Sequence, residues 1–275
     1  MSPAKKAETE KSKRVFTFSR SQLCIPYAVF LLFFVVFPLL LIVYYAFTAK
    51  TGEFTFANFR WFFENPASLK NLFSSMLLGI ITTAVCLVIG YPVAYILSRI
   101  KSHRRTVLLL LFIMPMWINF VLRAMAMKEL LSLIGIYGKH DYLSVVIGMV
   151  YDYLPFMILP LYTTLIKMDK SLEEAAMDLG ASRVNVFVKV TLPLSAAGIM
   201  SGVTMVFLPS MTCYVISDTF GYGKVIIIGK IIETWFGGNW NYGSVVALIL
   251  LVIMFLCTLL TGGFSKQESV RGTAL

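Results

Sequence analysis

Long apolar runs, separated by short polar segments, constrain this sequence more than any other feature. Six runs reach about the 20 residues that a helix needs to cross a hydrocarbon core roughly 30 Å thick. They lie near 25–47, 71–98, 106–127, 143–166, 195–217 and 243–263. With a mean hydropathy of +0.81, the chain has too little polar surface to cover a water-soluble domain. The sequence predicts an all-α, polytopic membrane protein with six transmembrane helices.

The runs divide the chain into three parts. We expect a basic cytoplasmic tail at 1–22, a transmembrane domain at 23–264 and a second cytoplasmic tail at 265–275. The first run is too long for a secretory signal and lacks a small-residue cleavage site, so we expect it to remain as a membrane span.

Basic residues indicate the orientation of the spans. Most of the 24 Lys and Arg residues lie in the two tails and in the loops at 99–105 and 167–193. These residues are Lys5, Lys6, Lys11, Lys13, Arg14, Arg20, Arg99, Lys101, Arg104, Arg105, Lys167, Lys170, Arg183, Lys189, Lys266 and Arg271. The positive-inside rule therefore predicts that both termini and the 167–193 loop are cytoplasmic. The net charge of +10 reflects topology and lipid contact, and it does not predict a nucleic-acid partner.

One acidic residue lies deep in an apolar run. Entering from the outside at Tyr142, Asp152 comes about 15 Å down a helix, close to the membrane midplane, where a carboxylate is costly and usually functional. Arg123, a base within a span, is its candidate partner, but on straight helices the two differ in depth by about 10 Å. The sequence leaves open whether Asp152 lines a polar cavity or forms a structural ion pair.

The segment 216–244, expected outside the membrane, is rich in glycine, and we expect a re-entrant or interfacial hairpin there. Its acids, Asp218 and Glu233, are candidates for contacting a solute or an external partner. Trp235 and Trp240 fit the aromatic belt of a membrane interface.

The cytoplasmic loop contains the stretch SLEEAAMDLG at 171–180. Ser171 and Glu174 form the S-x-x-E pattern of a capping box, and Gly180 is suited to end the helix in a left-handed conformation. A short cytoplasmic helix is therefore expected at about 169–180. We expect a second helix from Ser182 to about Thr191, ending before a proline.

Apolar and small residues share one face of the 171–180 helix: Leu172, Ala175 or Ala176, and Leu179. A helix this short is marginal in water and needs a docking surface. The stripe fits a groove on a cytoplasmic protein. Alternatively, Leu172 and Leu179 contact the lipid interface or helices of this same chain, and periodicity alone does not decide.

Residues 174–193, EAAMDLGASRVNVFVKVTLP, resemble the EAA signature of ABC importer permeases. The matching elements are Glu174-Ala175-Ala176, Gly180, Val190 in place of the commoner Ile, and Leu192-Pro193. The stretches 90–99, 150–165 and 217–243 also resemble the spermidine/putrescine permease group, in its first-permease type.

The resemblance implies a six-helix subunit in a bacterial cell membrane with three kinds of protein partner. These are a second, homologous permease, two copies of a cytoplasmic ABC ATPase and an extracellular polyamine-binding protein. It also implies that the helix at about 169–180 is the coupling helix, which contacts the ATPase through Glu174, Ala175, Ala176, Asp178 and Gly180.

A polyamine cargo would require carboxylates and aromatic faces for its ammonium groups. The residues that meet this requirement are Asp152, Tyr151, Tyr153, Trp117, Asp218 and Glu233.

The chain lacks the groups of an enzyme. It has no G-x-x-x-x-G-K-[ST] phosphate loop, no catalytic constellation and no metal-ligand spacing among its four cysteines and two histidines. We expect no cofactor in this chain and expect ATP and Mg²⁺ to be used by the partner ATPase. The alternative functions are a permease for another small solute and an ATP-independent secondary transporter.

Overall fold

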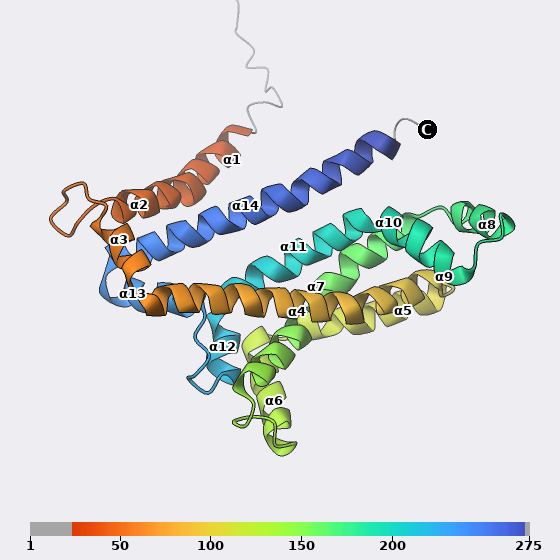
Figure 1. The fold of residues 1–275 in the computed structure, drawn as a ribbon, viewed down its shortest axis with the longest axis horizontal. Helices are drawn as coiled ribbons and strands as arrows, with labels where there is room; N and C mark the ends of the chain where they lie inside the picture. The colour runs from red at the N-terminus through yellow and green to blue at the C-terminus, as the bar shows by residue number, and fades with distance from the viewer. Residues whose placement is uncertain (1–23, 273–275) are drawn as a thin grey trace, which may run out of the picture. The chain divides into compact units, whose positions relative to one another are not determined.

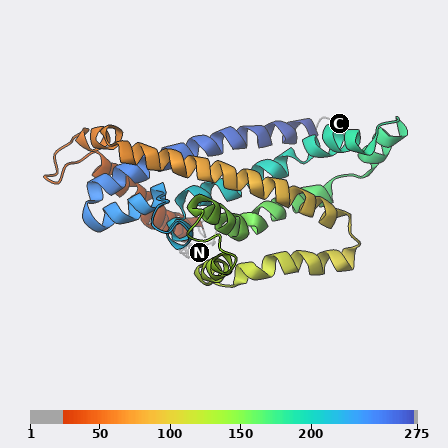
Figure 2. The same ribbon diagram turned by 60° about the horizontal axis from the view of Figure 1, so that its bottom comes forward.

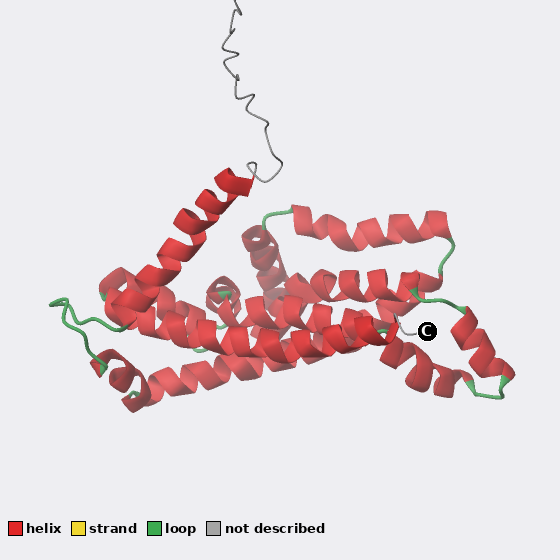
Figure 3. Ribbon diagram, turned by 90° about the horizontal axis from the view of Figure 1, so that it is seen from above, coloured by secondary structure: helices red, strands yellow, loops and turns green. Residues whose placement is uncertain are grey.

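The computed structural model describes residues 24–272. Within this range the chain consists of helices and loops, and one isolated bridge pairs Thr48 with Phe54, so the all-α prediction is confirmed (Figure 3). The helices are α1 (Cys24–Leu31), η2 (Leu32–Val36), α2 (Phe37–Ala46), α3 (Ala57–Glu64), α4 (Pro66–Arg99), α5 (Ser102–Ile113), η3 (Met114–Trp117), α6 (Phe120–Leu133), α7 (Asp141–Lys167), α8 (Ser171–Asp178), α9 (Arg183–Val186), η4 (Phe187–Thr191), α10 (Leu192–Leu194), α11 (Ala196–Thr212), α12 (Tyr214–Phe220), α13 (Ile228–Gly238) and α14 (Trp240–Gly272).

The chain divides into two compact units, with the boundary in the sequence between Ile42 and Val43. The first unit contains α1, η2 and the start of α2, whose apolar side chains are largely exposed, as expected for a helix that faces lipid. The basic tail predicted at 1–22 lies outside the described residues. The helix α14 continues to Gly272, into the segment expected as the C-terminal tail.

Four helical stretches of the described chain are long and apolar enough to cross a membrane. They are Ile25–Ala46, Pro66–Arg99, Asp141–Lys167 and Trp240–Leu259. Two further spans exist if each of two bent helix pairs is counted as one. The pair Arg104–Trp117 and Phe120–Leu133 bends by 97°, and the pair Arg183–Leu194 and Ala196–Thr212 bends by 63°. The third and fifth predicted spans therefore coincide with breaks, and Figures 1 and 2 show the corner between α5 and α6.

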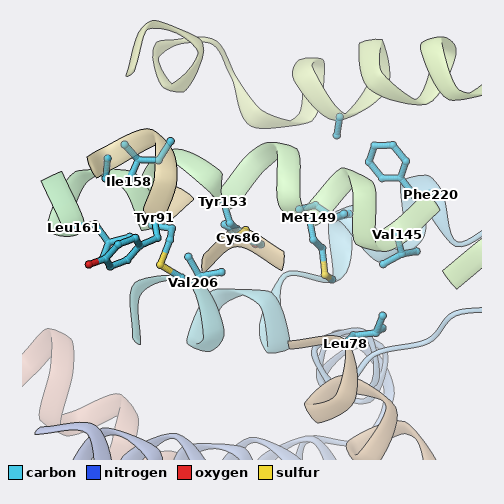
Figure 4. Close-up of a cluster of buried hydrophobic side chains, with 14 of the residues drawn as sticks. Leu78, Cys86, Tyr91, Val145, Met149, Tyr153, Ile158, Leu161, Val206 and Phe220 are labelled. Atoms are coloured by element: carbon cyan, nitrogen blue, oxygen red, sulfur yellow. The ribbon is translucent and has the colours of Figure 1, made fainter. Parts of the chain in front are cut away.

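The helices α4, α7 and α11 form the core of the second unit. Small residues allow these helices to approach closely: a Cβ on Gly202 would lie 2.6 Å from the Met157 sulfur, and one on Gly198 would lie 2.7 Å from the Thr164 hydroxyl. Close packing of this kind holds helices together in lipid, where water does not drive association. Figure 4 shows the buried side chains between them, among them Cys86 and Val206.

A second cluster joins the helices α3, α13 and α14 through buried residues that include Phe62, Ile228 and Val245. Beside it, two buried amides satisfy the carbonyl groups at the end of α2. Asn58 Nδ2 donates to the carbonyls of Ala46 and Thr48, and Asn241 Nδ2 donates to those of Tyr45 and Thr48. The last carbonyls of a helix have no partner within it, so these amides fix its C-terminal end.

The segment 216–244, expected outside the membrane, includes most of the short helix α12 and all of α13, joined by a turn in which Tyr222 and Gly223 have positive φ angles. The expected hairpin thus consists of two short helices, of which neither is long enough to span a membrane.

Candidate functional sites

The helix α8 is held on the rest of the chain by one buried side chain, Glu173. Its carboxylate Oε1 pairs with the guanidinium of Arg99, the last residue of α4, and accepts a hydrogen bond of 2.9 Å from the Thr191 hydroxyl. The Arg99 guanidinium also lies 4.9 Å from the centre of the Tyr95 ring. Glu173 is 7% exposed, so burial strengthens these contacts. The sequence did not identify this role, since neither partner lies near Glu173 in the chain.

The opposite face of α8 is open. Leu179 is 90% exposed and Leu172 is 48% exposed. Glu174, Ala175, Asp178 and Gly180 are also exposed, whereas Ala176 is half-buried. Leu179 is therefore open and Leu172 is only partly covered, which argues against the alternative that these two leucines pack on other helices of this chain.

The predicted capping box at the start of α8 is wrong. The helix begins one residue earlier than the pattern requires, because Lys170 occupies the N-cap position and Ser171 is already helical. The backbone N–H of Ser171 donates to Asp169 Oδ1 over 3.0 Å, and this hydrogen bond lowers the pKa of the Asp169 carboxyl. Glu174 is therefore free of a capping role.

The predicted stop at Gly180 is confirmed. Gly180 has a φ of +84°, its N–H donates to the Met177 carbonyl, and the N–H of Ala181 donates to the Ala176 carbonyl. This pair of bonds is the Schellman arrangement, which needs a left-handed residue at the position of Gly180.

The helix after Gly180 is longer than predicted, since it was expected to end at about Thr191. Ser182 caps it, with its hydroxyl accepting from the Asn185 N–H, but α10 continues through Pro193 to Leu194. Pro193 follows directly on the π-helical turn η4, where the regular hydrogen-bond pattern of an α-helix is already interrupted. The break comes at Ser195, whose hydroxyl lies 2.8 Å from the Tyr91 hydroxyl of α4.

Arg123 of α6 and Asp152 of α7 form a direct ion pair. Arg123 Nη2 lies 2.7 Å from Asp152 Oδ1, and Arg123 Nη1 donates to the Pro115 carbonyl over 3.0 Å. Arg123 is 7% exposed and Asp152 is 3% exposed. The predicted separation in depth is wrong because it assumed a straight third span, whereas the 97° corner before Phe120 turns α6 toward α7.

The same pair lines a cavity of about 500 Å³. Its lining residues are Met116, Trp117, Ile118, Asn119, Phe120, Arg123, Asp152, Tyr153, Phe156, Pro209, Cys213 and Ile216. The two alternatives for Asp152 are therefore both realised, since it forms an ion pair and lines a cavity. Aromatic rings surround this pair, an environment suited to organic cations.

The predicted path residues separate into two groups. Trp117, Asp152 and Tyr153 line the cavity, and the Tyr151 ring lies beside it, 5.9 Å from the Arg123 guanidinium. Tyr153 also donates a long hydrogen bond of 3.4 Å to the Pro209 carbonyl.

The other two predicted path residues, Asp218 and Glu233, lie away from the cavity. Lys230 Nζ lies 2.9 Å from Asp218 and 3.0 Å from Glu233. The hydrogen bond to Asp218, followed by that to Glu233, raises the pKa of the Lys230 ammonium. Among the described residues, no three His, Cys, Asp or Glu side chains gather closely enough to hold a metal ion.

Comparison with known proteins places these two sites in context. Residues 86–266 match the family described as binding-protein-dependent transport system inner membrane component. The spermidine/putrescine transport system permease protein PotB of Haemophilus influenzae is 36% identical over 82% of this chain and 87% of its own length. The Escherichia coli K12 protein of the same name is 34% identical over 83% of this chain and 91% of its own length.

Solved structures show the same fold at low identity. One chain of a bacterial ABC transporter that imports the acidic polysaccharide alginate superposes with a TM-score of 0.73 and 15% identity, covering 90% of this chain and 94% of that one. At this identity the likeness concerns the fold alone.

Proposed function

The chain belongs to the family of binding-protein-dependent transport system inner membrane components, and on this premise we propose that it forms half of an ATP-driven import path for polyamines such as spermidine and putrescine. It is an ABC transporter permease subunit, which is a transport component and not an enzyme.

The cavity beside Asp152 is the observation that carries the polyamine assignment. A carboxylate attracts an ammonium group, and the rings of Trp117 and Tyr153 offer faces for cation–π contact and for the methylene chain of the cargo. The permease names of the relatives that are 34–36% identical support the same solute class.

The open face of α8 supports docking on a cytoplasmic ATPase. We infer two ATPase copies, one below this chain and one below a second, homologous permease, together with an external polyamine-binding protein that delivers the cargo. ATP and Mg²⁺ would be held by the ATPase. In this arrangement α8, the basic loops and both termini are cytoplasmic.

The contacts of α8 provide a route by which movement of the ATPase is transmitted to the helices of the membrane domain. Movement of α8 passes through Glu173 to Arg99 at the end of α4, and through Thr191 to the segment that leads into α11. The helices α4 and α11 are core helices, so their displacement would open the cavity alternately to the two sides. The ATPase with and without bound ATP would bind the outward-open and inward-open arrangements of the permease with different affinities. This difference would drive the change from one arrangement to the other.

The decisive test is to purify the chain with its ATPase, sister permease and receptor and to reconstitute the complex in liposomes. We expect spermidine or putrescine, with the receptor, to stimulate ATP hydrolysis and uptake. If neither amine stimulates the complex and another solute does, the polyamine assignment is wrong. Uptake that persists without the ATPase would instead favour a secondary transporter.

The docking face has a separate test. A cysteine introduced by Leu179→Cys lies on an exposed position, and we expect a membrane-impermeant maleimide to label it only from the cytoplasmic side. Bound ATPase should protect it. Labelling from outside, or labelling that the ATPase does not affect, would contradict docking through α8.

A further inference from the structure

The charged groups of the cavity neutralise each other. Arg123 Nη2 is 2.7 Å from Asp152 Oδ1, and both residues line the cavity. Among the described residues, no other Asp, Glu, Lys or Arg lines it. An amine that enters therefore finds the carboxylate of Asp152 already engaged by a cation of the protein.

Arg123 has partners that do not depend on Asp152. Its Nη1 donates to the Pro115 carbonyl, and its guanidinium lies 5.9 Å from the centre of the Tyr151 ring. Its Nε, although buried, has no hydrogen-bond partner among the described residues. The guanidinium can therefore leave the carboxylate and keep contacts at the corner between η3 and α6.

Both charges are almost fully buried, so the ion pair is more stable than either charge without a partner. An unpaired carboxylate at this depth would hold a proton or a small cation tightly. A cavity that bound its cargo equally tightly would also fail to release it. Exchange of one cation for another at Asp152 removes both difficulties, because the carboxylate always has one cation beside it while the displaced guanidinium keeps the Pro115 carbonyl.

We propose that Arg123 is a placeholder for the cargo amine at Asp152. In the cargo-free state the guanidinium occupies the carboxylate. An incoming alkylammonium group replaces it, and the guanidinium returns to the carboxylate as the amine leaves on the cytoplasmic side. This inference rests on the proposed transport of amines.

The proposal has a thermodynamic consequence. If the cargo must compete with the guanidinium, its apparent affinity equals its intrinsic affinity multiplied by the fraction of the protein in which Asp152 is free. Removing the guanidinium should therefore raise the affinity of the membrane site for an amine. If removal of the arginine only disturbs the fold, or removes a favourable contact with the cargo, binding is unchanged or weaker.

The experiment measures equilibrium binding of radiolabelled spermidine to the complete permease–ATPase complex in nanodiscs, without the receptor. We expect Arg123→Gln to bind spermidine about tenfold more tightly than the parent. We expect Asp152→Asn to bind it at least tenfold more weakly, since one counter-charge is lost. Arg60→Gln, which removes an exposed ion pair with Glu64, is the control and should match the parent.

A double variant separates competition from general effects. Adding Arg123→Gln to Asp152→Asn should give no gain, because the carboxylate for which the guanidinium competes is absent. This double variant has no unpaired charge, so its assembly is also the check that the site tolerates glutamine. Should Arg123→Gln alone not assemble, Arg123→Lys serves instead, with an expected smaller gain, since an ammonium lacks the forked geometry of a guanidinium.

Binding by assembled Arg123→Gln that equals or falls below that of the parent would overturn the placeholder. A gain that persists in the Asp152→Asn background would overturn it as well. Failure of the proposed function has a different signature: the parent complex itself neither binds nor transports an amine.

Discussion

Glu173 and Arg99 lie 74 residues apart in the sequence, yet their side chains form the ion pair that joins α8 to the end of α4. Glu173 is followed directly by Glu174, and the two side chains project about 100° apart around the axis of α8, the first buried and the second exposed. The first holds the helix on its own chain, and the second is exposed on the face proposed to meet the ATPase.

The first prediction concerns this ion pair. Glu173→Gln keeps an acceptor for the Thr191 hydroxyl but removes the charge that Arg99 faces. A hydrogen bond to a charged group contributes about 1.5–3 kcal/mol, so we expect uptake per ATP hydrolysed to fall about tenfold. The measurement is the ratio of uptake to hydrolysis in proteoliposomes. Glu64→Gln, which removes an exposed pair, should leave the ratio unchanged; an unchanged ratio for Glu173→Gln would contradict the anchoring role.

The second prediction concerns the stop at Gly180. A Cβ there would meet nothing within 4 Å, so any cost arises from the positive φ alone. A left-handed conformation costs an ordinary residue about 1–2 kcal/mol, more for a β-branched one, whereas asparagine adopts it readily. We expect Gly180→Val to reduce uptake and ATPase stimulation at least tenfold, and Gly180→Asn to retain most of both. Parental activity of the valine variant would show that the end of α8 is not rigidly required.

A third prediction compares two glycines of α13. A Cβ on Gly229 would lie 2.0 Å from the Thr212 carbonyl oxygen, whereas one on Gly237 would meet nothing within 4 Å. We expect Gly229→Ala to destabilise the protein by about 1–3 kcal/mol, because a backbone group cannot move aside cheaply. Gly237→Ala should be neutral or slightly stabilising. Thermal unfolding in detergent measures both, and equal midpoints would contradict the close contact of α13 with the end of α11.

The fourth prediction compares two asparagines at the start of α14. Asn241 donates from Nδ2 to two carbonyls, so Asn241→Asp removes the donors and brings a negative charge toward those oxygens. We expect a loss of about 1–3 kcal/mol. Asn239 instead accepts from the Asn241 N–H, and aspartate performs this cap equally well. Asn239→Asp should therefore unfold at the parental temperature; a matching loss in both variants would contradict the assignment of donor and acceptor.

Local chemistry explains which parts of the fold the sequence predicts. The apolar runs give the helices, because a membrane span needs a minimum length, and Gly180 gives the end of α8, because few residues adopt its φ angle. The corner at Ile118 and Asn119 has weaker signals: Pro115 interrupts the helical pattern just before it, and Asn119 caps α6 by accepting from the Val121 N–H. These residues indicate a break, but its angle of 97° depends on how α6 packs against α7.

The sequence also identifies some residues of the candidate sites and misses others. Asp152 is recognisable from the sequence because a carboxylate in an apolar run is unusual. Its direct pairing with Arg123 is not, because depth along a straight helix misplaces the arginine. Glu173 offers no signal, since it differs from Glu174 only through partners on α4 and η4 that are distant in the chain.

The corner before α6 fixes the number of residues between Asn119 and Arg123. Arg123 is on the first turns of α6, so one residue inserted or deleted between Asn119 and Arg123 would rotate its side chain by about 100° about the helix axis. The guanidinium would then point away from α7, and two orphaned charges would remain inside an apolar region. Functional versions of this permease should accept many exchanges of amino acid in that stretch but no change of its length.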